Sequence, residues 1–183
     1  SLSLSLSLSL FHEFQSGFRK HHSCGSALTR MCDTWLSAIN KSQLSATVFL
    51  DFKKAFDLVN HNTLLKKLLL YTRSEATVSF VRSFLFNRSQ RVVLNADYSK
   101  LGYIECGVPQ GSVLGPLLFC IFINDLPLHI VNKAVALDLF ADDSSLHTSS
   151  SDVKTAQSNL QEELNNVAKW CTCNKMIVHP QKT

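Results

Sequence analysis

The chain has 183 residues, 45% of them hydrophobic, and a formal net charge of +4. This length and apolar content suffice for one hydrophobic core, and no apolar run approaches the length that a membrane anchor requires. The cysteines show no Cys-x₂-Cys pairing, which argues against a disulfide or zinc framework and favours reduced, mostly buried thiols of an intracellular protein; they occupy positions 24, 32, 106, 120, 171 and 173.

The first ten residues are five Ser-Leu repeats. Strict alternation imitates an amphipathic strand, but low complexity without a partner strand favours disorder. The segment has neither a basic start nor an unbroken apolar core, so it does not read as a signal peptide. We therefore expect disorder over residues 1–10 and one folded domain over residues 11–183.

The first half of the domain predicts three helices and one strand. A first helix is indicated by apolar residues at helical spacing, with Ser23 or Ser26 as its cap; these residues are Leu28, Met31, Trp35 and Ile39. Residues 46–51 predict a strand that ends in Asp51. Helices follow over residues 55–71 and 75–86, and the leucines of the former that we expect to pack inward are Leu64, Leu65, Leu68 and Leu69.

A hairpin and a turn-rich segment come next. Residues 91–94 and 101–105 predict two strands that pair across a turn at residues 95–97. Residues 107–116 form the only dense Gly/Pro cluster, and they open an apolar helix that we expect to end at Asn124. Glycines let another backbone or a bulky ligand approach closely, although a simple strand-to-helix turn explains this cluster equally well by itself.

Two adjacent carboxylates, Asp142 and Asp143, lie at a tight turn between strands predicted over residues 135–140 and 144–148. Like-charge repulsion makes such a pair unfavourable unless a cation neutralises it, and Mg²⁺ is usually held by one or two carboxylates plus phosphates. An isolated Asp-Asp pair is more simply a solvent-facing turn. However, Asp51 supplies a third acid at a second strand end, and such a set suits two metal ions roughly 3.5–4 Å apart.

The last part predicts a long polar helix over residues 152–173 and an edge strand at residues 177–178. Helices grouped against a largely antiparallel sheet make an α+β fold. Cys171, Cys173 and His179 are a weak candidate for part of a metal site, because no fourth ligand is apparent.

The charge is unevenly distributed along the chain. Residues 1–100 carry 13 Lys/Arg and 6 Asp/Glu, a balance of +7, whereas residues 101–183 carry 5 and 8, a balance of −3. A basic half suits a groove that follows a nucleic-acid backbone and faces an acidic centre. The alternative, solvated helix faces, best explains Lys66 and Lys67. Arg88 and Arg91 are better candidates for phosphate contact, as are Arg19 and Lys20 in the basic loop before the first helix.

From Gln15 to the last residue, the order of these segments resembles the reverse transcriptase domain of non-LTR (LINE-type) retrotransposons of the jockey-like branch, truncated at both ends. Residues 48–57 (VFLDFKKAFD) resemble motif A of that family, and residues 107–119 (GVPQGSVLGPLLF) resemble motif B. Residues 140–143 (FADD) resemble motif C.

The resemblance implies a palm-like antiparallel sheet packed with helices, with partial fingers and no thumb, over residues 11–183. It also implies that Asp51 and Asp142 ligate two Mg²⁺ ions, for which Mn²⁺ can substitute. Asp143 would complete the acidic cluster, and the carbonyl of Phe52 would offer an extra oxygen.

Further roles follow from the same resemblance. Phe56 would pack under the sugar and exclude ribonucleotides by a clash with the 2′-hydroxyl, although core packing also explains this residue. Gln110 would lie near the sugar of the incoming nucleotide, and Gly111 would keep the backbone low beneath the template-primer. Lys182 falls near the lysine of motif D, which assists the leaving pyrophosphate; a solvated lysine is the alternative.

The implied function is RNA-directed DNA polymerase activity, with an RNA template, a DNA primer and dNTPs as partners, no membrane, and a location in the cytoplasm and/or nucleus. Two alternatives remain open: a non-catalytic retroelement remnant with at most weak nucleic-acid binding, and a different two-metal enzyme. The Pro-Gln-Gly element and Phe56 argue against the latter, since both serve a template-primer and a sugar. Because basic finger segments and a thumb have no counterpart here, we expect this fragment to be catalytically inactive. The oligomeric state is undetermined.

Overall fold

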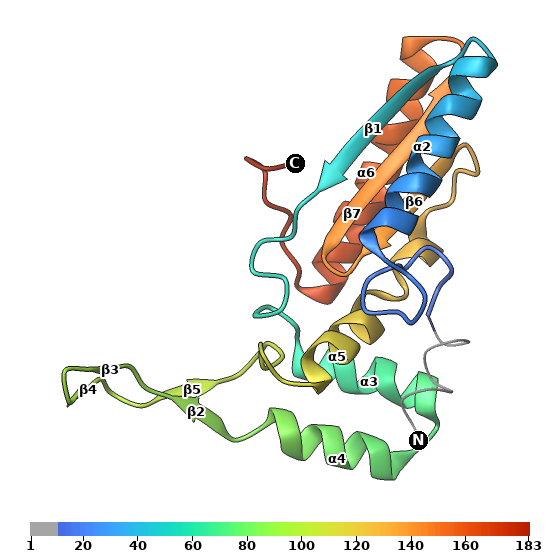
Figure 1. Cartoon of the computed structure of the whole chain (residues 1–183). Helices are drawn as coiled ribbons and strands as arrows, with labels where there is room; N and C mark the ends of the chain where they lie inside the picture. Colours follow the sequence, from blue (N-terminus) through green and yellow to red (C-terminus); the bar gives the residue numbers. More distant parts are fainter. Residues whose placement is uncertain (1–10) are drawn as a thin grey trace.

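The computed structural model describes residues 11–183, so the Ser-Leu repeat and its predicted disorder lie outside the described residues. An antiparallel sheet of three strands in the order β1-β7-β6 lies at the centre of the upper part in Figure 1. Helix α2 lies across one face of this sheet and helix α6 across the other (Figure 1). These elements are β1 (Leu44–Leu50), β6 (Val135–Phe140), β7 (Asp143–Ser150), α2 (Cys24–Asn40) and α6 (Val153–Asn174). The predicted α+β fold is confirmed.

Strand β7 lies between the other two strands, and the side chains of residues 144–148 are all buried, which places both of its faces in contact with protein. The helices that flank the sheet begin at side-chain caps. Ser23 and Ser26 form a reciprocal capping box at the start of α2, and the side chain of Asp152 accepts from the Thr155 N–H at the start of α6.

A second group of helices packs below the sheet (Figure 1). Seven of the ten residues of the apolar helix α5 are buried, and the helix packs against α3. The core joins both groups through large side chains that include Phe119, Phe122 and Trp170. The remaining elements are α3 (His61–Thr72), α4 (Glu75–Leu85), α5 (Leu114–Ile123) and the short 3₁₀-helix η1 (Leu126–His129).

The apolar spacing of α2 predicted the helix correctly but not which residues it buries. Met31 is buried, whereas Leu28 is 58% exposed and Ile39 is 64% exposed. Among the inward leucines predicted for α3, Leu69 is 37% exposed, and the other three are buried.

Two predicted boundaries were wrong. The helix expected from residue 55 begins only at His61, where the side chain of Asn60 accepts from the Thr63 N–H. The residues before it form turns: Lys54 adopts a positive φ of 46°, and the Asp57 N–H donates to its carbonyl. At the other end of the chain, the edge strand expected at residues 177–178 is a single bridge between Phe52 and Val178.

The predicted hairpin exists, but in a different register. Strand β2 (Arg88–Gln90) pairs with β5 (Gly102–Ile104), and β3 (Val93–Leu94) pairs separately with β4 (Asp97–Tyr98). The turn contains only Asn95 and Ala96, both with positive φ, which is the backbone that a two-residue hairpin turn requires. These strands form a narrow arm that projects from the helices in Figure 1.

A contact that the sequence did not predict extends the sheet beyond β6. Gln15 forms a parallel bridge with Leu139, the Ser16 N–H donates to the Leu139 carbonyl, and the Leu139 N–H donates to the Phe14 carbonyl. The segment after the Ser-Leu repeat thus lies directly against the strand that leads to the two adjacent aspartates.

Candidate active site

The two adjacent aspartates lie on the tight turn between β6 and β7. Phe140 pairs with Asp143 across the hairpin, so Ala141 and Asp142 are the turn residues, with Ala141 at a φ of +57°. Asp142 is half-buried, whereas Asp143 is exposed. Burial, and then the neighbouring carboxylates of Asp143 and Asp51, raise the pKa of the Asp142 carboxyl above its ordinary value.

Asp51 comes to the same end of the sheet through strand pairing. The last pair between β1 and β7 joins Leu50 to Ser144, so the next step along both strands brings Asp51 beside Asp143. The Asp51 carboxylate also raises the pKa of Asp142, as expected for two nearby negative charges. The carboxylate of Asp51 also pairs with Lys182, whose Nζ lies 3.5 Å from Asp51 Oδ2.

The donor set of this site fits Mg²⁺. Among residues 11–183, no three His, Cys, Asp or Glu side chains are already gathered into a metal cage. Mg²⁺ does not require one, because it keeps several waters and is typically bound through one or two carboxylates together with substrate phosphates. Around the bridge to Val178, the Lys53 N–H and the Asp51 carbonyl bond to the C-terminal segment. By the alternation of an antiparallel pair, the Phe52 carbonyl points away from that segment.

Phe56 lies in the turns between Asp51 and α3, and it is half-buried. Its ring stacks on the ring of Phe119 in α5, with centroids 4.4 Å apart and planes inclined by 21°. One face of Phe56 therefore contributes to the core. Core packing and contact with a ligand are compatible for a ring held in this position.

The Gly/Pro loop before α5 is bonded directly to those turns. The Gly107 N–H donates to the Val59 carbonyl, and the Val108 N–H donates to the Phe56 carbonyl, each at 2.8 Å. Gly107 has a φ of +88°, and a Cβ atom there would lie 2.7 Å from the Asp57 carbonyl oxygen, so only glycine fits. His61 Nε2, at the start of α3, lies 2.7 Å from the Gly107 carbonyl oxygen and ties the loop to that helix.

The tip of the same loop carries the two predicted nucleotide-binding residues. Gln110 is exposed, and its Nε2 donates to Asp57 Oδ1 at 2.8 Å. Gly111 has a φ of +78° and open space where a side chain would be. The structure thus connects the segment that follows Asp51 to the Gly/Pro loop.

The C-terminal segment also contacts Asp51. The His179 N–H donates to the Asp51 carbonyl at 2.7 Å, and Lys182 forms the ion pair described above. The Lys182 side chain is 64% exposed, so the pair lies at the surface and contributes little to stability. Cys171 and Cys173 belong to α6, where the former is buried and the latter exposed.

The four predicted nucleic-acid-binding residues lie in two separate places. Arg19 donates to the carbonyls of His12 and Gln15, each at 3.1 Å, so part of its charge is used within the fold, and Lys20 is exposed. Arg88 and Arg91 belong to the arm, where the guanidinium of Arg91 lies 4.2 Å from the ring centroid of Tyr98.

Lys67 contradicts its prediction as a solvated lysine. It is buried, its Nζ donates to the Phe122 carbonyl and to Asp125, each at 2.7 Å, and burial lowers its pKa. Lys66, its neighbour, is exposed as expected.

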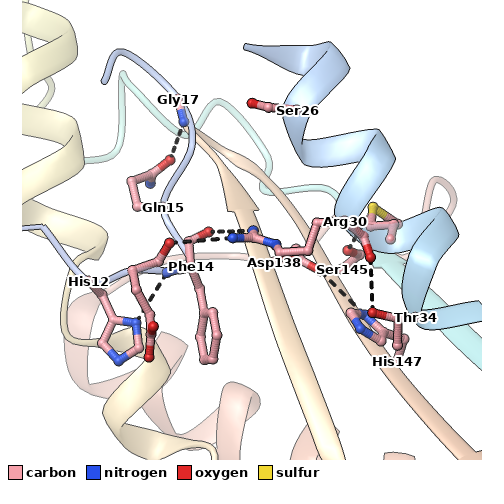
Figure 2. A network of polar contacts seen from close by, with 12 residues as sticks. His12, Phe14, Gln15, Gly17, Ser26, Arg30, Thr34, Asp138, Ser145 and His147 are labelled. Atoms are coloured by element: carbon pink, nitrogen blue, oxygen red, sulfur yellow. Dashed lines mark hydrogen bonds and ion pairs between the residues drawn. The ribbon is translucent and has the colours of Figure 1, made fainter. Parts of the chain in front are cut away.

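Figure 2 shows a polar network that sequence reasoning missed, with side chains from α2, β6 and β7. Asp138 on β6 is buried and pairs with Arg30 from α2, and its Oδ2 lies 3.5 Å from His147 Nδ1 on β7. Burial lowers the pKa of His147, and although Asp138 opposes this effect, Arg30 adds to it. The signal in the sequence was a single carboxylate that interrupts the apolar run at residues 135–140.

Comparison with known proteins places the chain in a family. The family described as reverse transcriptase (RNA-dependent DNA polymerase) matches residues 2–183. A probable RNA-directed DNA polymerase from transposon BS of Drosophila melanogaster is 37% identical over 93% of the chain. The RNA-directed DNA polymerase from the mobile element jockey of the same species is 35% identical over 93% of the chain. In both cases the aligned region is 19% of the relative, so the chain spans about a fifth of their length.

Solved structures agree with this at the level of the fold. Apo telomerase from Candida tropicalis superposes with a TM-score of 0.73 at 13% identity, over 97% of this chain and 34% of that one. Telomerase from the same organism in complex with a fragment of telomeric RNA gives a TM-score of 0.73 at 14% identity, over 99% of this chain and 31% of that one. None of the helices in residues 11–183 is long and apolar enough to cross a membrane.

Proposed function

Because the chain belongs to the reverse transcriptase (RNA-dependent DNA polymerase) family, we propose that residues 11–183 carry the catalytic centre of an RNA-directed DNA polymerase from a non-LTR retrotransposon. The reaction is nucleotidyl transfer from a dNTP to the 3′-hydroxyl of a DNA primer on an RNA template. The single observation that carries this proposal is the convergence of two strand ends, because the pairing of β1 with β7 brings Asp51 to the turn that holds Asp142 and Asp143.

Asp51 and Asp142, with Asp143 beside them, are the residues that would hold two Mg²⁺ ions, with Mn²⁺ as a substitute and the Phe52 carbonyl as an extra ligand. Bound metal of this kind stabilises the charge on the attacking and leaving oxygens of a phosphoryl transfer. Burial first, and then the carboxylates of Asp143 and Asp51, raise the pKa of Asp142, and a cation held between these carboxylates would relieve their repulsion. Asp51 already pairs with the ammonium of Lys182.

The residues around the acids would place the nucleotide. Phe56, fixed by its stacking on Phe119, would stand under the sugar and clash with a 2′-hydroxyl. Gln110 donates a hydrogen bond to Asp57 and would lie near the same sugar. Because Gly111 has no side chain, the loop there would leave room for the template-primer. Lys182 would exchange its contact with Asp51 for the pyrophosphate that leaves.

Nucleic acid would be bound mainly through charge. The arm combines Arg88 and Arg91 with the exposed ring of Tyr98, and basic and aromatic side chains together suit the backbone and bases of a single strand. Arg19 and Lys20 supply a second basic site near the start of the domain. We place the protein in the cytoplasm and/or nucleus, where its template and its target DNA occur.

The test is a replacement experiment. Residues 11–183 take the place of the aligned region in the jockey polymerase, and primer extension on an RNA template is measured with dNTPs and Mg²⁺. We expect extension by the chimera and its loss, by at least about a hundredfold, in Asp142→Asn, because the metals would be left with less neutralising charge.

The matched control is Asp152→Asn, which removes an acidic side chain beyond the opposite end of β7, where it caps α6. Because Asn caps a helix about as well as Asp does, this variant is expected to change stability by less than about 1 kcal/mol and to keep extension. Extension by Asp142→Asn at the level of the unsubstituted chimera contradicts the proposal. A chimera that binds template-primer in Mg²⁺ without extending it favours the non-catalytic alternative.

A further inference from the structure

The tight turn that carries Asp142 is braced by a residue from the other end of the chain, Gln15. We infer that Gln15 is a positioning residue, whose side-chain amide sets the affinity of the acidic site for a divalent cation. This inference rests on the proposed function, since it assumes that Asp51 and Asp142 hold that cation.

The contact between Gln15 and the turn is direct and buried. Gln15 Oε1 accepts from the Ala141 N–H at 3.0 Å and from its own segment, the Gly17 N–H, at 2.7 Å. The side chain has no exposed surface at all, so neither bond competes with water. Ala141 is the residue immediately before Asp142, so a hydrogen bond to its N–H fixes the backbone of the turn itself.

Two unfavourable interactions would displace the turn if no other segment held it. Ala141 has a φ of +57°, a conformation that costs about 1–2 kcal/mol for a residue with a Cβ atom. Asp142 and Asp143 also repel one another across one peptide bond. A bond from a buried acceptor to the Ala141 N–H opposes both tendencies, and it keeps the carboxylate of Asp142 where the end of β1 brings Asp51.

The brace is itself rigid. Gly17 packs so closely on the turn that a Cβ atom on it would overlap the Ala141 nitrogen. Arg30 donates to the carbonyls of Glu13 and Phe14, each at 3.4 Å, and pairs with Asp138 on β6, as Figure 2 shows in part. Backbone pairing with Leu139 fixes the same segment to the strand. The Gly17 contact, the Arg30 hydrogen bonds and the Leu139 pairing together fix the segment that carries Gln15.

The unused half of the amide supports the same interpretation. Gln15 Nε2 is buried and has no hydrogen-bond partner within the described residues. Burying an unpaired N–H₂ group is unfavourable, so a glutamine at this position carries a cost to stability. What the residue supplies in return is an acceptor that reaches two backbone N–H groups.

The experiment uses the purified 183-residue chain and Mn²⁺ alone as the probe, with free Mn²⁺ measured by electron paramagnetic resonance. Gln15→Met keeps the length of the side chain and removes the acceptor. We expect the Kd for Mn²⁺ to rise about tenfold or more, the usual effect of removing a group that orients a metal ligand.

The matched control is Glu163→Met. Glu163 is fully buried and likewise accepts from two backbone N–H groups, those of Val131 and Asn132, but on a different loop. It should lower the melting temperature and leave the Kd of the folded protein within about twofold. An equal rise in Kd in both variants would mean that lost stability, rather than positioning, is responsible, and would overturn the inference.

Hydrogen exchange on the unsubstituted chain provides a second measurement if Gln15→Met fails to fold. The Ala141 amide should exchange at least about tenfold more slowly than the Ala96 amide, which lies in the exposed two-residue turn of the arm and also has a positive φ. Equal exchange rates at the two turns would overturn the inference.

The two proposals fail in different ways. If Asp142→Asn leaves Mn²⁺ binding unchanged, the acidic site and the proposed function are wrong. If Asp142→Asn abolishes binding while Gln15→Met binds as well as the unsubstituted chain, the acidic site stands, and only the role of Gln15 is wrong.

Discussion

Individual buried charges in this protein are matched by specific partners. Lys67 reaches the Phe122 carbonyl and Asp125, and Trp170 Nε1 donates to the same carboxylate at 2.9 Å. Asp138 is similarly held by Arg30. A buried charge that loses its partner is strongly unfavourable, so these residues tie α3, the η1 turn and α6 into one arrangement.

His147 gives a pH dependence whose sign follows from its environment. The pKa of His147 is lowered in the folded protein. Below the ordinary pKa of about 6.5, the unfolded chain therefore binds a proton at this histidine more readily than the folded chain does. We expect the free energy of unfolding to fall as the pH drops from about 7.5 to about 5, measured by urea denaturation. In His147→Gln this fall should be smaller, whereas the exposed control His129→Gln should behave as the unsubstituted chain. An identical pH dependence in all three proteins would show that His147 does not contribute.

Phe56 gives a test of sugar selection. In the jockey chimera, Phe56→Ala removes the ring that we place under the sugar, so the incorporation of ribonucleotides relative to deoxyribonucleotides should rise at least about tenfold. The control is Phe84→Ala, which truncates another half-buried phenylalanine on α4. The assay is single-nucleotide primer extension with each nucleotide type. Unchanged selectivity in Phe56→Ala would leave core packing against Phe119 as the role of this ring.

At the scale of elements, the site is a junction between segments that are distant in the chain. Strand pairing brings the end of β1 to the turn between β6 and β7. Backbone hydrogen bonds join the Gly/Pro loop to the turns that follow Asp51. The loop lies on the turns that follow Asp51 with no room for a side chain at Gly107. Displacing that loop should therefore disturb the segment from Asp51 to Phe56.

Three glycines separate backbone strain from steric overlap. Gly111→Ala places a side chain on a backbone with positive φ but without steric overlap, and it should lower the free energy of unfolding by about 1–2 kcal/mol. Gly107→Ala meets a positive φ and an overlap with Asp57, so its cost should be larger than that of Gly111→Ala. Gly25→Ala in the first turn of α2 should be neutral or stabilising by up to about 1 kcal/mol. Urea denaturation of the four proteins gives the order, and a Gly107→Ala variant as stable as Gly111→Ala would contradict this account.

At the scale of the whole molecule, charge is separated along the chain: residues 1–100 hold 13 of the 18 Lys/Arg, and residues 101–183 hold 8 of the 14 Asp/Glu. Folding brings the acidic turn of the second half against the end of β1 from the first. A modest net charge of +4 therefore coexists with a basic arm and an acidic centre.

Binding of an RNA–DNA template-primer to the 183-residue chain should be weak and steeply salt-dependent. Arg91→Ala should weaken binding and reduce the slope of log K against log salt by about 1, since each phosphate contact releases counterions. Lys66→Ala, which removes an exposed cation from α3, is the control and should change neither. Fluorescence anisotropy at several salt concentrations measures both quantities, and equal slopes for the two variants would remove Arg91 from the interface.

The sequence by itself determined the family through the resemblance of three motifs. It also determined the α+β class and most elements, because apolar periodicity and caps are local. The strand before Asp51, the hairpin around Asp142 and the helices at 24–40, 75–85 and 153–174 needed no knowledge of their neighbours. It also indicated the three acids, since adjacent carboxylates at a turn are unfavourable without a cation.

Only the tertiary structure decided which residues meet. The start of α3 moved to His61 because the preceding turns bond to the Gly/Pro loop, and the arm changed register because two residues with positive φ make its turn. Lys67 left solvent for Asp125, which is 58 residues away along the chain, and Gln15 reached Ala141 across 126 residues. Hydrogen bonds between distant segments leave no periodic pattern in a sequence, because each depends on where the fold brings two backbones together.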